Sequence, residues 1–92
     1  MLEIKDITTF SLKSSLTLKN ILGETYFLLD SETGKQYDLT ELEYQIVYLI
    51  SKSAKFIDIV NEIANEYDEQ KNIIKQDVRE YIEEMVNAGL IV

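Results

Sequence analysis

The chain changes its hydrophobic period within residues 37–50, YDLTELEYQIVYLI. Before Thr40, apolar and polar residues alternate in short runs. After Thr40, apolar residues recur every three or four positions, which is typical of an amphipathic helix. Thr40 and Glu43 have the spacing of a capping box, in which each side chain accepts a hydrogen bond from the other residue's backbone N–H. The boundary therefore predicts strands before residue 40 and helices after it.

Three strands are predicted upstream of this boundary. The first is expected within residues 7–18, where apolar and polar residues alternate on either side of an interruption at 13–15. The second is expected at residues 24–30, followed by the polar segment 31–34, which ends in a glycine suited to the positive φ of a turn. The third, residues 35–39, is short and the last of its sheet, so we expect it at an edge with free backbone N–H and C=O groups.

Three amphipathic helices are predicted downstream, at about residues 41–52, 56–68 and 71–88. Gly89 provides a natural C-terminal stop for the third helix. The expected fold class is α+β, with an N-terminal three-stranded antiparallel sheet followed by three α-helices in one domain, residues 1–92. The inward-facing residues of the helices are expected to be Leu42, Ile46, Leu49, Ile50, Phe56, Ile59, Val60, Ile63, Ala64, Tyr67, Ile74, Val78, Tyr81, Ile82 and Met85.

Composition excludes several classes of function. The 92 residues include no cysteine and no histidine, which removes thiolate nucleophiles, imidazole acid–base catalysis and the usual transition-metal ligands. The glutamates of the predicted helices lie at the spacing of solvated faces, not in a cleft that would shift one pKa of a catalytic pair. We therefore expect no enzymatic activity, no cofactor and no metal site.

The charge balance also restricts the partners. Nine lysines and arginines stand against seventeen aspartates and glutamates, a net charge of −8 that repels nucleic acid and anionic lipid. No basic N-terminus precedes a continuous apolar run, and the apolar clusters are too short to cross a bilayer. We expect a cytoplasmic protein that binds neither nucleic acid nor membrane.

Three short motifs of the helical half resemble a known family. They are Ile63-Ala64-x-x-Tyr67, Asp77-Val78-x-x-Tyr81-Ile82 and Gly89-Leu90-Ile91. They are similar to the motifs of the PqqD-like family, the recognition elements of ribosomally synthesised, post-translationally modified peptides. Upstream pieces of the family pattern are also present, at residues 28–30, 37–40 and 46–49, so the resemblance covers about two-thirds of the chain. The chain departs from the family at Phe56, where a small polar residue is common, and at Val47, where tryptophan is common.

The resemblance implies a winged helix-turn-helix-like fold and a binding mechanism. In this family the leader segment of a precursor peptide adds as an antiparallel strand beside the third strand and lies against the third helix, with backbone hydrogen bonds providing affinity and side-chain pockets providing specificity. Val78 and Ile82 are the expected apolar wall, although both also fit ordinary core positions. The candidate edge residues are Lys35, Gln36, Tyr37, Asp38 and Leu39.

Charged residues divide the third predicted helix into two flanks. Lys71, Lys75 and Arg79 are spaced four apart and form one stripe, whereas Asp77, Glu80 and Glu84 fall on the other flank. A basic stripe bordering the groove would receive acidic side chains of a leader peptide, so Lys75 and Arg79 are candidate site residues. Asp77 is a further candidate because the resemblance places an aspartate there. An ordinary solvated helix face is the alternative.

The expected function is that of a non-catalytic adaptor. The resemblance implies a stand-alone protein, ending at Val92, that captures the leader of a precursor and delivers it to a separate maturation enzyme. The resemblance favours lasso-peptide pathways, where that enzyme is a leader protease. The next choice is the role of PqqD proper, where the enzyme is a radical enzyme that modifies a quinone-cofactor precursor. We expect a monomer or a weak dimer. The alternatives are a winged-helix DNA-binding regulator, which the net charge disfavours, and a structural subunit of a larger complex.

Overall fold

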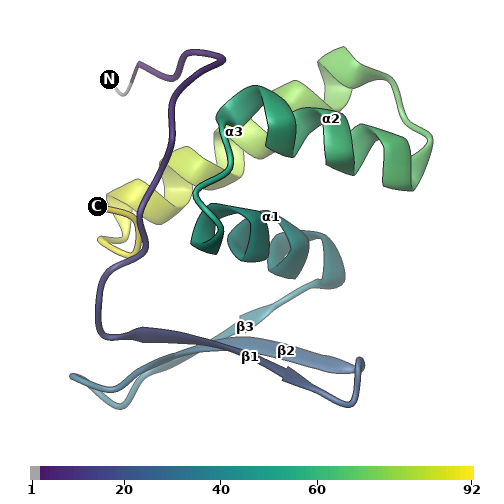
Figure 1. Cartoon of the computed structure of the whole chain (residues 1–92). Coiled ribbons are helices and arrows are strands. Elements are labelled where there is room, and N and C mark those ends of the chain that lie inside the picture. Colours follow the sequence, from purple (N-terminus) through teal and green to yellow (C-terminus); the bar gives the residue numbers. More distant parts are fainter. Residues whose placement is uncertain (1–2) are drawn as a thin grey trace.

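The computed structural model describes residues 3–92 and has the predicted order of elements, three strands followed by three helices (Figure 1). The α+β fold class is therefore confirmed. The elements are β1 Leu16–Ile21, β2 Thr25–Asp30, β3 Gln36–Leu39, α1 Glu41–Ser51, α2 Phe56–Tyr67 and α3 Lys71–Asn87.

The three strands form one antiparallel sheet in the order β1-β2-β3. Leu28 of β2 lies opposite Leu18 of β1 and Tyr37 of β3, which sets the register of both ladders. One face of the sheet packs against α1, with α2 and α3 on the far side of that helix (Figure 1). β3 is an edge strand, as predicted, and no strand within residues 3–92 pairs with its outer side.

The first predicted strand is wrong over most of its length. β1 begins at Leu16, and the alternating residues before it belong to an extended N-terminal segment, residues 3–13, that crosses the helices (Figure 1). Ile4 and Phe10 are buried in the core. The apolar alternation at Phe10 and Leu12 therefore reflects packing against helices and the C-terminus, where Leu12 forms a bridge with Ile91, and not a place in the sheet.

The N-terminal segment also completes the start of α2. The N-cap residue Lys55 gives no side-chain hydrogen bond. Instead, the Phe56 N–H donates to the Thr8 carbonyl (2.8 Å) and the Ile57 N–H donates to the Asp6 carbonyl (3.0 Å). Because the first N–H groups of a helix have no partner within it, these carbonyls take the place of a cap.

The helix boundaries follow the local signals. The predicted capping box of α1 is confirmed, since the Glu43 N–H donates to Thr40 Oγ1 (3.1 Å) and the Thr40 N–H donates to Glu43 Oε1 (2.8 Å). Each helix ends one residue before its predicted end. Asp68 follows α2 in the left-handed conformation (φ 50°), and Gly89 stops α3 with φ 77°.

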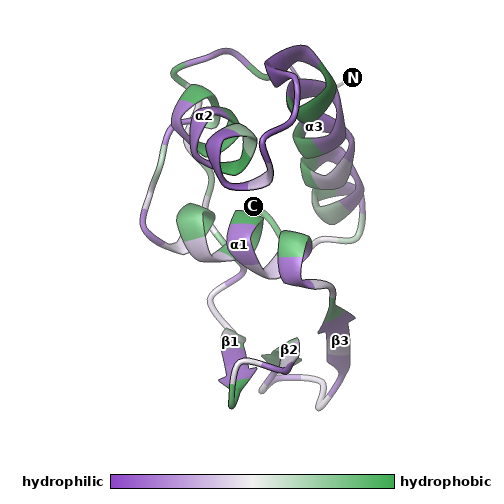
Figure 2. Ribbon diagram, turned by 90° about the vertical axis from the view of Figure 1, so that its right-hand side faces the viewer, coloured by the Kyte–Doolittle hydropathy of each residue, from purple (hydrophilic) through white to green (hydrophobic). Residues whose placement is uncertain are grey.

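Each helix carries both hydrophobic and hydrophilic stretches (Figure 2). None of the helices in the described part of the chain is long and apolar enough to span a membrane. The buried apolar residues form one core, which comprises Ile4, Phe10, Leu28, Ile46, Val47, Ile50, Phe56, Ile59, Val60, Ile63, Ile74, Val78, Ile82, Met85, Leu90 and Ile91.

Candidate functional site

The free edge of β3 presents the backbone groups of two residues. The Asp30 N–H donates to the Lys35 carbonyl (2.9 Å), which identifies Asp30 and Lys35 as a hydrogen-bonded pair. Hydrogen-bonded pairs alternate along an antiparallel ladder, so Tyr37 and Leu39 also bond to β2. The N–H and C=O groups of Gln36 and Asp38 consequently point away from the sheet, where a further strand would pair with them.

The side chains of β3 alternate between two environments. Tyr37 and Leu39 are half-buried and pack against the core, whereas Gln36 and Asp38 are exposed. The Gln36 amide donates to the Asp38 carboxylate (2.9 Å) on this exposed face. Lys35 precedes the strand and is also exposed, so all five predicted edge residues lie at or beside the free edge.

A groove of about 190 Å³ runs beside this edge, between β3 and α3. We call it the β3–α3 groove. Its volume is below the roughly 300–1,000 Å³ of typical small-molecule sites, which suits side chains of a peptide better than a bound cofactor. Its lining residues are Tyr37, Asp38, Leu39, Glu43, Tyr81, Glu84, Met85, Ala88 and Leu90.

Tyr81 is the largest residue that α3 contributes to the groove. Burial, followed by the nearby carboxylates of Glu43 and Glu84, raises the pKa of its phenol above the ordinary value. The hydroxyl therefore stays protonated at neutral pH, and the ring offers an apolar surface with one polar end.

Val78 and Ile82 do not form the predicted apolar wall. Their exposed fractions are 1% and 0%, because both face the interior between the helices. On the groove side of α3 the half-buried Tyr81 and the exposed Glu84 line the groove, with the exposed Ala88 just after the helix and the buried Met85 behind them. The sequence pattern correctly marks Val78 and Ile82 as core residues, and the prediction that they line the groove is wrong.

Lys75 and Arg79 lie on the opposite flank of α3 from the groove. The Lys75 ammonium pairs with the Asp6 carboxylate (3.2 Å), and the Arg79 guanidinium donates to the Ile4 carbonyl (3.3 Å) and lies 5.2 Å from the centre of the Phe56 ring. Both cations therefore hold the N-terminal segment. Asp77 is exposed and does not line the groove.

The flank that faces the groove is the acidic one. At 100° per residue, Tyr81, Glu84 and Ala88 lie on the side of α3 away from Lys75 and Arg79. Glu84 of this flank, together with Asp38 and Glu43, gives the groove an acidic rim, and the basic residues predicted to border it lie on the other flank. The groove residues that were not predicted from the sequence are Glu43, Tyr81, Glu84, Met85, Ala88 and Leu90. The opposite charges of the two flanks of α3 are visible in the sequence, but not which flank faces the groove.

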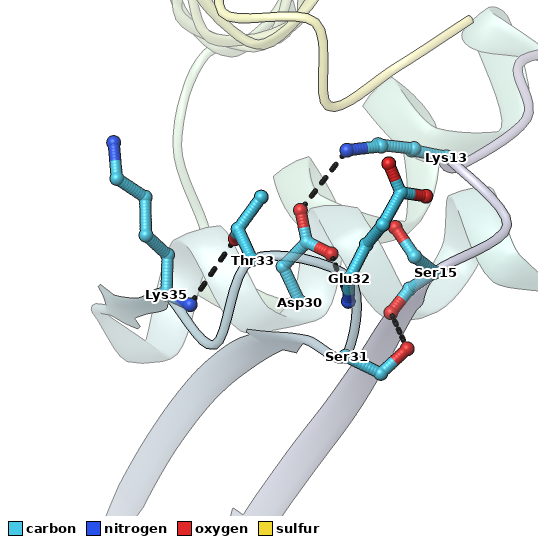
Figure 3. A network of polar contacts seen from close by, with 7 residues as sticks. All are labelled: Lys13, Ser15, Asp30, Ser31, Glu32, Thr33 and Lys35. Atoms are coloured by element: carbon cyan, nitrogen blue, oxygen red, sulfur yellow. Dashed lines mark hydrogen bonds and ion pairs between the residues drawn. The ribbon is translucent and has the colours of Figure 1, made fainter.

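A buried carboxylate fixes the turn before β3 (Figure 3). Asp30, 1% exposed, accepts hydrogen bonds from the Lys13 ammonium (3.0 Å) and the Glu32 N–H (2.9 Å). The Ser15 hydroxyl, then Lys13 and the Glu32 N–H, lower the pKa of Asp30 below its ordinary value. The hydrogen bond to Asp30 in turn raises the pKa of Lys13. This network joins the segment before β1 to the β2–β3 turn and so positions the edge strand.

Within residues 3–92, no cluster of acidic side chains has the arrangement of a metal site. The candidate site is a strand edge with an adjoining groove.

Comparison with known proteins places this geometry in a family. No curated protein matches the chain. Two solved structures share its fold: TbiB1 in complex with the TbiA(beta) leader peptide (21% identity, 88% of this chain and 93% of that chain covered, TM-score 0.78), and a lasso peptide synthetase B1 complexed with the leader peptide (16% identity, 92% and 99% covered, TM-score 0.81). The family model described as coenzyme PQQ synthesis protein D (PqqD) matches residues 25–91, from β2 to the C-terminal bridge. The chain belongs to the PqqD family.

Proposed function

We propose that this protein binds the leader segment of a precursor peptide as a fourth antiparallel strand at β3. The observation that carries the proposal is the outward direction of the Gln36 and Asp38 backbone groups beside the β3–α3 groove. Two proteins with the same fold have been solved with leader peptides bound, which supports the same class of ligand here.

Strand addition accounts for both affinity and selectivity. The peptide's backbone would bond to Gln36 and Asp38, while alternate side chains would enter the groove against Tyr37, Leu39 and Tyr81. The other sheet edge is less suitable, because the hollow near it includes only Leu16 of β1, whereas the β3–α3 groove includes three residues of β3.

The acidic rim changes the expected charge of the ligand. Asp38, Glu43 and Glu84 border the groove, and no lysine or arginine lines it. Like charges brought together at an interface are unfavourable. The bound peptide segment would therefore carry neutral or basic side chains next to its apolar anchors, rather than the acidic ones that a basic stripe would select.

The protein would act as an adaptor without chemistry of its own. It has no cysteine or histidine, and its groove gathers apolar and acidic side chains without a nucleophile. By holding the leader and contacting a separate maturation enzyme, it would raise the local concentration of the precursor at that enzyme. The likeness to lasso peptide synthetase B1 favours a cytoplasmic lasso-peptide pathway with a leader protease as that enzyme.

A DNA-binding role has little support. The basic residues Lys75 and Arg79 are engaged by the N-terminal segment, and the net charge of −8 repels phosphate.

The proposal is tested by titrating the protein with the leader segment of a precursor encoded beside it, with a DNA duplex as control. Two variants of one residue make the test specific. Asp38→Pro removes an outward N–H without touching the β2–β3 ladder and should weaken leader binding by at least about tenfold, whereas Asp38→Ala keeps that N–H and should retain most of the affinity. Equal binding by both variants, or no leader binding by the unmodified protein, would overturn the proposal.

A further inference from the structure

A second, smaller cavity lies between α1 and α2. Tyr44, Gln45 and Tyr48 line it from α1, and Glu62 and Glu66 line it from α2. Its volume is about 110 Å³, which is room for about four water molecules at about 30 Å³ each. That space is smaller than a typical small-molecule site and takes the end of one side chain. No residue lines both this cavity and the β3–α3 groove.

One wall of the cavity belongs to a row of stacked tyrosines. The Tyr26 and Tyr44 rings are 4.7 Å apart, and the Tyr44 and Tyr48 rings are 6.2 Å apart, each pair inclined by 29°. Tyr48 at the end of the row is 44% exposed, and the Lys52 ammonium lies 5.4 Å from the centre of its ring. The row thus already attracts a cation of its own chain, as the negative faces of aromatic rings do.

The other polar groups of the cavity are carboxylates and an amide, and no lysine or arginine lines it. Glu62 and Glu66 contribute two carboxylates one helical turn apart. Gln45 Oε1 is buried and accepts no hydrogen bond from any donor in residues 3–92. That oxygen is closed to solvent, so the exposed carboxylates of Glu62 and Glu66 are the acceptors of this cavity that a ligand can reach.

We propose that this cavity binds the guanidinium group of an arginine on a protein partner. The planar group would stack on the tyrosine face while its N–H groups donate to Glu62 and Glu66, a combination of flat surface and several donors that a lysine ammonium does not have. Tyrosine and arginine are also the residues that most often dominate protein interfaces. Since the two sites share no residue, the partner and a peptide at β3 can be bound together.

The test uses the full chain without any leader peptide, so its result does not depend on the proposed leader site. Backbone and tyrosine-ring NMR signals are followed during titration with Nα-acetyl-arginine amide and, in parallel, with Nα-acetyl-citrulline amide, which has the same shape but no charge. We expect saturable shifts for the arginine probe around Tyr44–Leu49 and Glu62–Glu66, with a Kd on the order of 1 mM, which is typical for a ligand of its size. The citrulline probe should bind at least about fivefold more weakly, because it brings no charge to the two carboxylates.

Variants separate the cavity from the general acidity of the protein. Tyr48→Ala and the double variant Glu62→Gln/Glu66→Gln should each weaken arginine binding several-fold, whereas Glu24→Gln, an exposed acidic residue of the β1–β2 hairpin, should not. Circular dichroism of each variant checks that the fold is kept. Shifts scattered over the whole acidic surface, equal binding of both probes, or an unchanged Kd in Tyr48→Ala would overturn the proposal.

Discussion

The two flanks of α3 share one helix and differ in what covers them. The flank with Lys75 and Arg79 is occupied by the N-terminal segment, which pairs with both cations. The flank with Tyr81 and Glu84 faces the β3–α3 groove and is open. A helical period identifies both flanks from sequence, but which of them stays open depends on where a segment about 70 residues away packs. Charge on a helix therefore becomes informative about a ligand only after the neighbours of each flank are known.

The largest expected effect is a loss of stability on substitution of the buried residues of α3, which lie between the two flanks. Ile82→Ala should lower the free energy of unfolding by about 2–5 kcal/mol, because the side chain is fully buried and its removal leaves a cavity. Urea denaturation followed by circular dichroism measures this loss. Since the loss is large for a small domain, Ile82→Val provides the matched test: it should lower the stability by about 0.5–1.5 kcal/mol and leave leader affinity unchanged. If Ile82→Val lost leader affinity without losing stability, Ile82 would line the groove and its assignment to the core would be contradicted.

Substitutions on the open flank should change the affinity for the leader peptide rather than the stability of the fold. Tyr81→Ala removes the main groove-facing side chain of α3 and should weaken leader binding by about 2 kcal/mol, or roughly 30-fold. Calorimetric titration measures the change. Tyr81→Phe, which keeps the ring, should retain most of the affinity. An unchanged Kd in Tyr81→Ala would place the peptide elsewhere on the molecule.

The Asp30 network at the β2–β3 turn, which positions the edge strand β3, should make the stability of the fold depend on pH. The pKa of Asp30 is lower in the folded protein than its ordinary 3.8, so the ionised network stabilises the fold fully above about pH 4, and this contribution is lost as the pH falls below that value. Asp30→Asn should therefore be less stable than the unmodified protein at neutral pH, and the difference should shrink at about pH 3. Urea titrations at both pH values test this, and a difference that stays constant between them would contradict the role of the network.

The covered flank should show the smallest effect. Lys75→Ala breaks an exposed ion pair with Asp6 and should change the free energy of unfolding by less than about 1 kcal/mol, with no change in leader affinity. Parallel denaturation and titration of this variant provide the measurement. A clear fall in the leader affinity of Lys75→Ala would show that the basic flank is part of the binding site.

Local signals made much of the fold predictable. The capping box at Thr40 and Glu43, the turn glycine Gly34 and the helix stop at Gly89 all depend on neighbouring residues, and the structure has each of them. The edge position of β3 was also predictable, because its strand is the last before the helices.

The remaining features depend on contacts between distant parts of the chain. Phe10 and Leu12 alternate like strand residues, yet they pack against the helices and the C-terminal bridge. Val78 and Ile82 have the same apolar period whether they face a groove or a core, and only the tertiary packing places them in the core. Tyr81, which the sequence marked as an inward residue, lies at the border between the core and the groove.

Amide-resolved hydrogen exchange with and without the leader peptide tests the central claim most directly. The Gln36 and Asp38 amides, which point away from the sheet, should exchange markedly more slowly when the peptide is bound, while exchange of the Lys75 and Arg79 amides should be unchanged. Unchanged exchange at Gln36 and Asp38 under saturating leader peptide would contradict strand addition at β3.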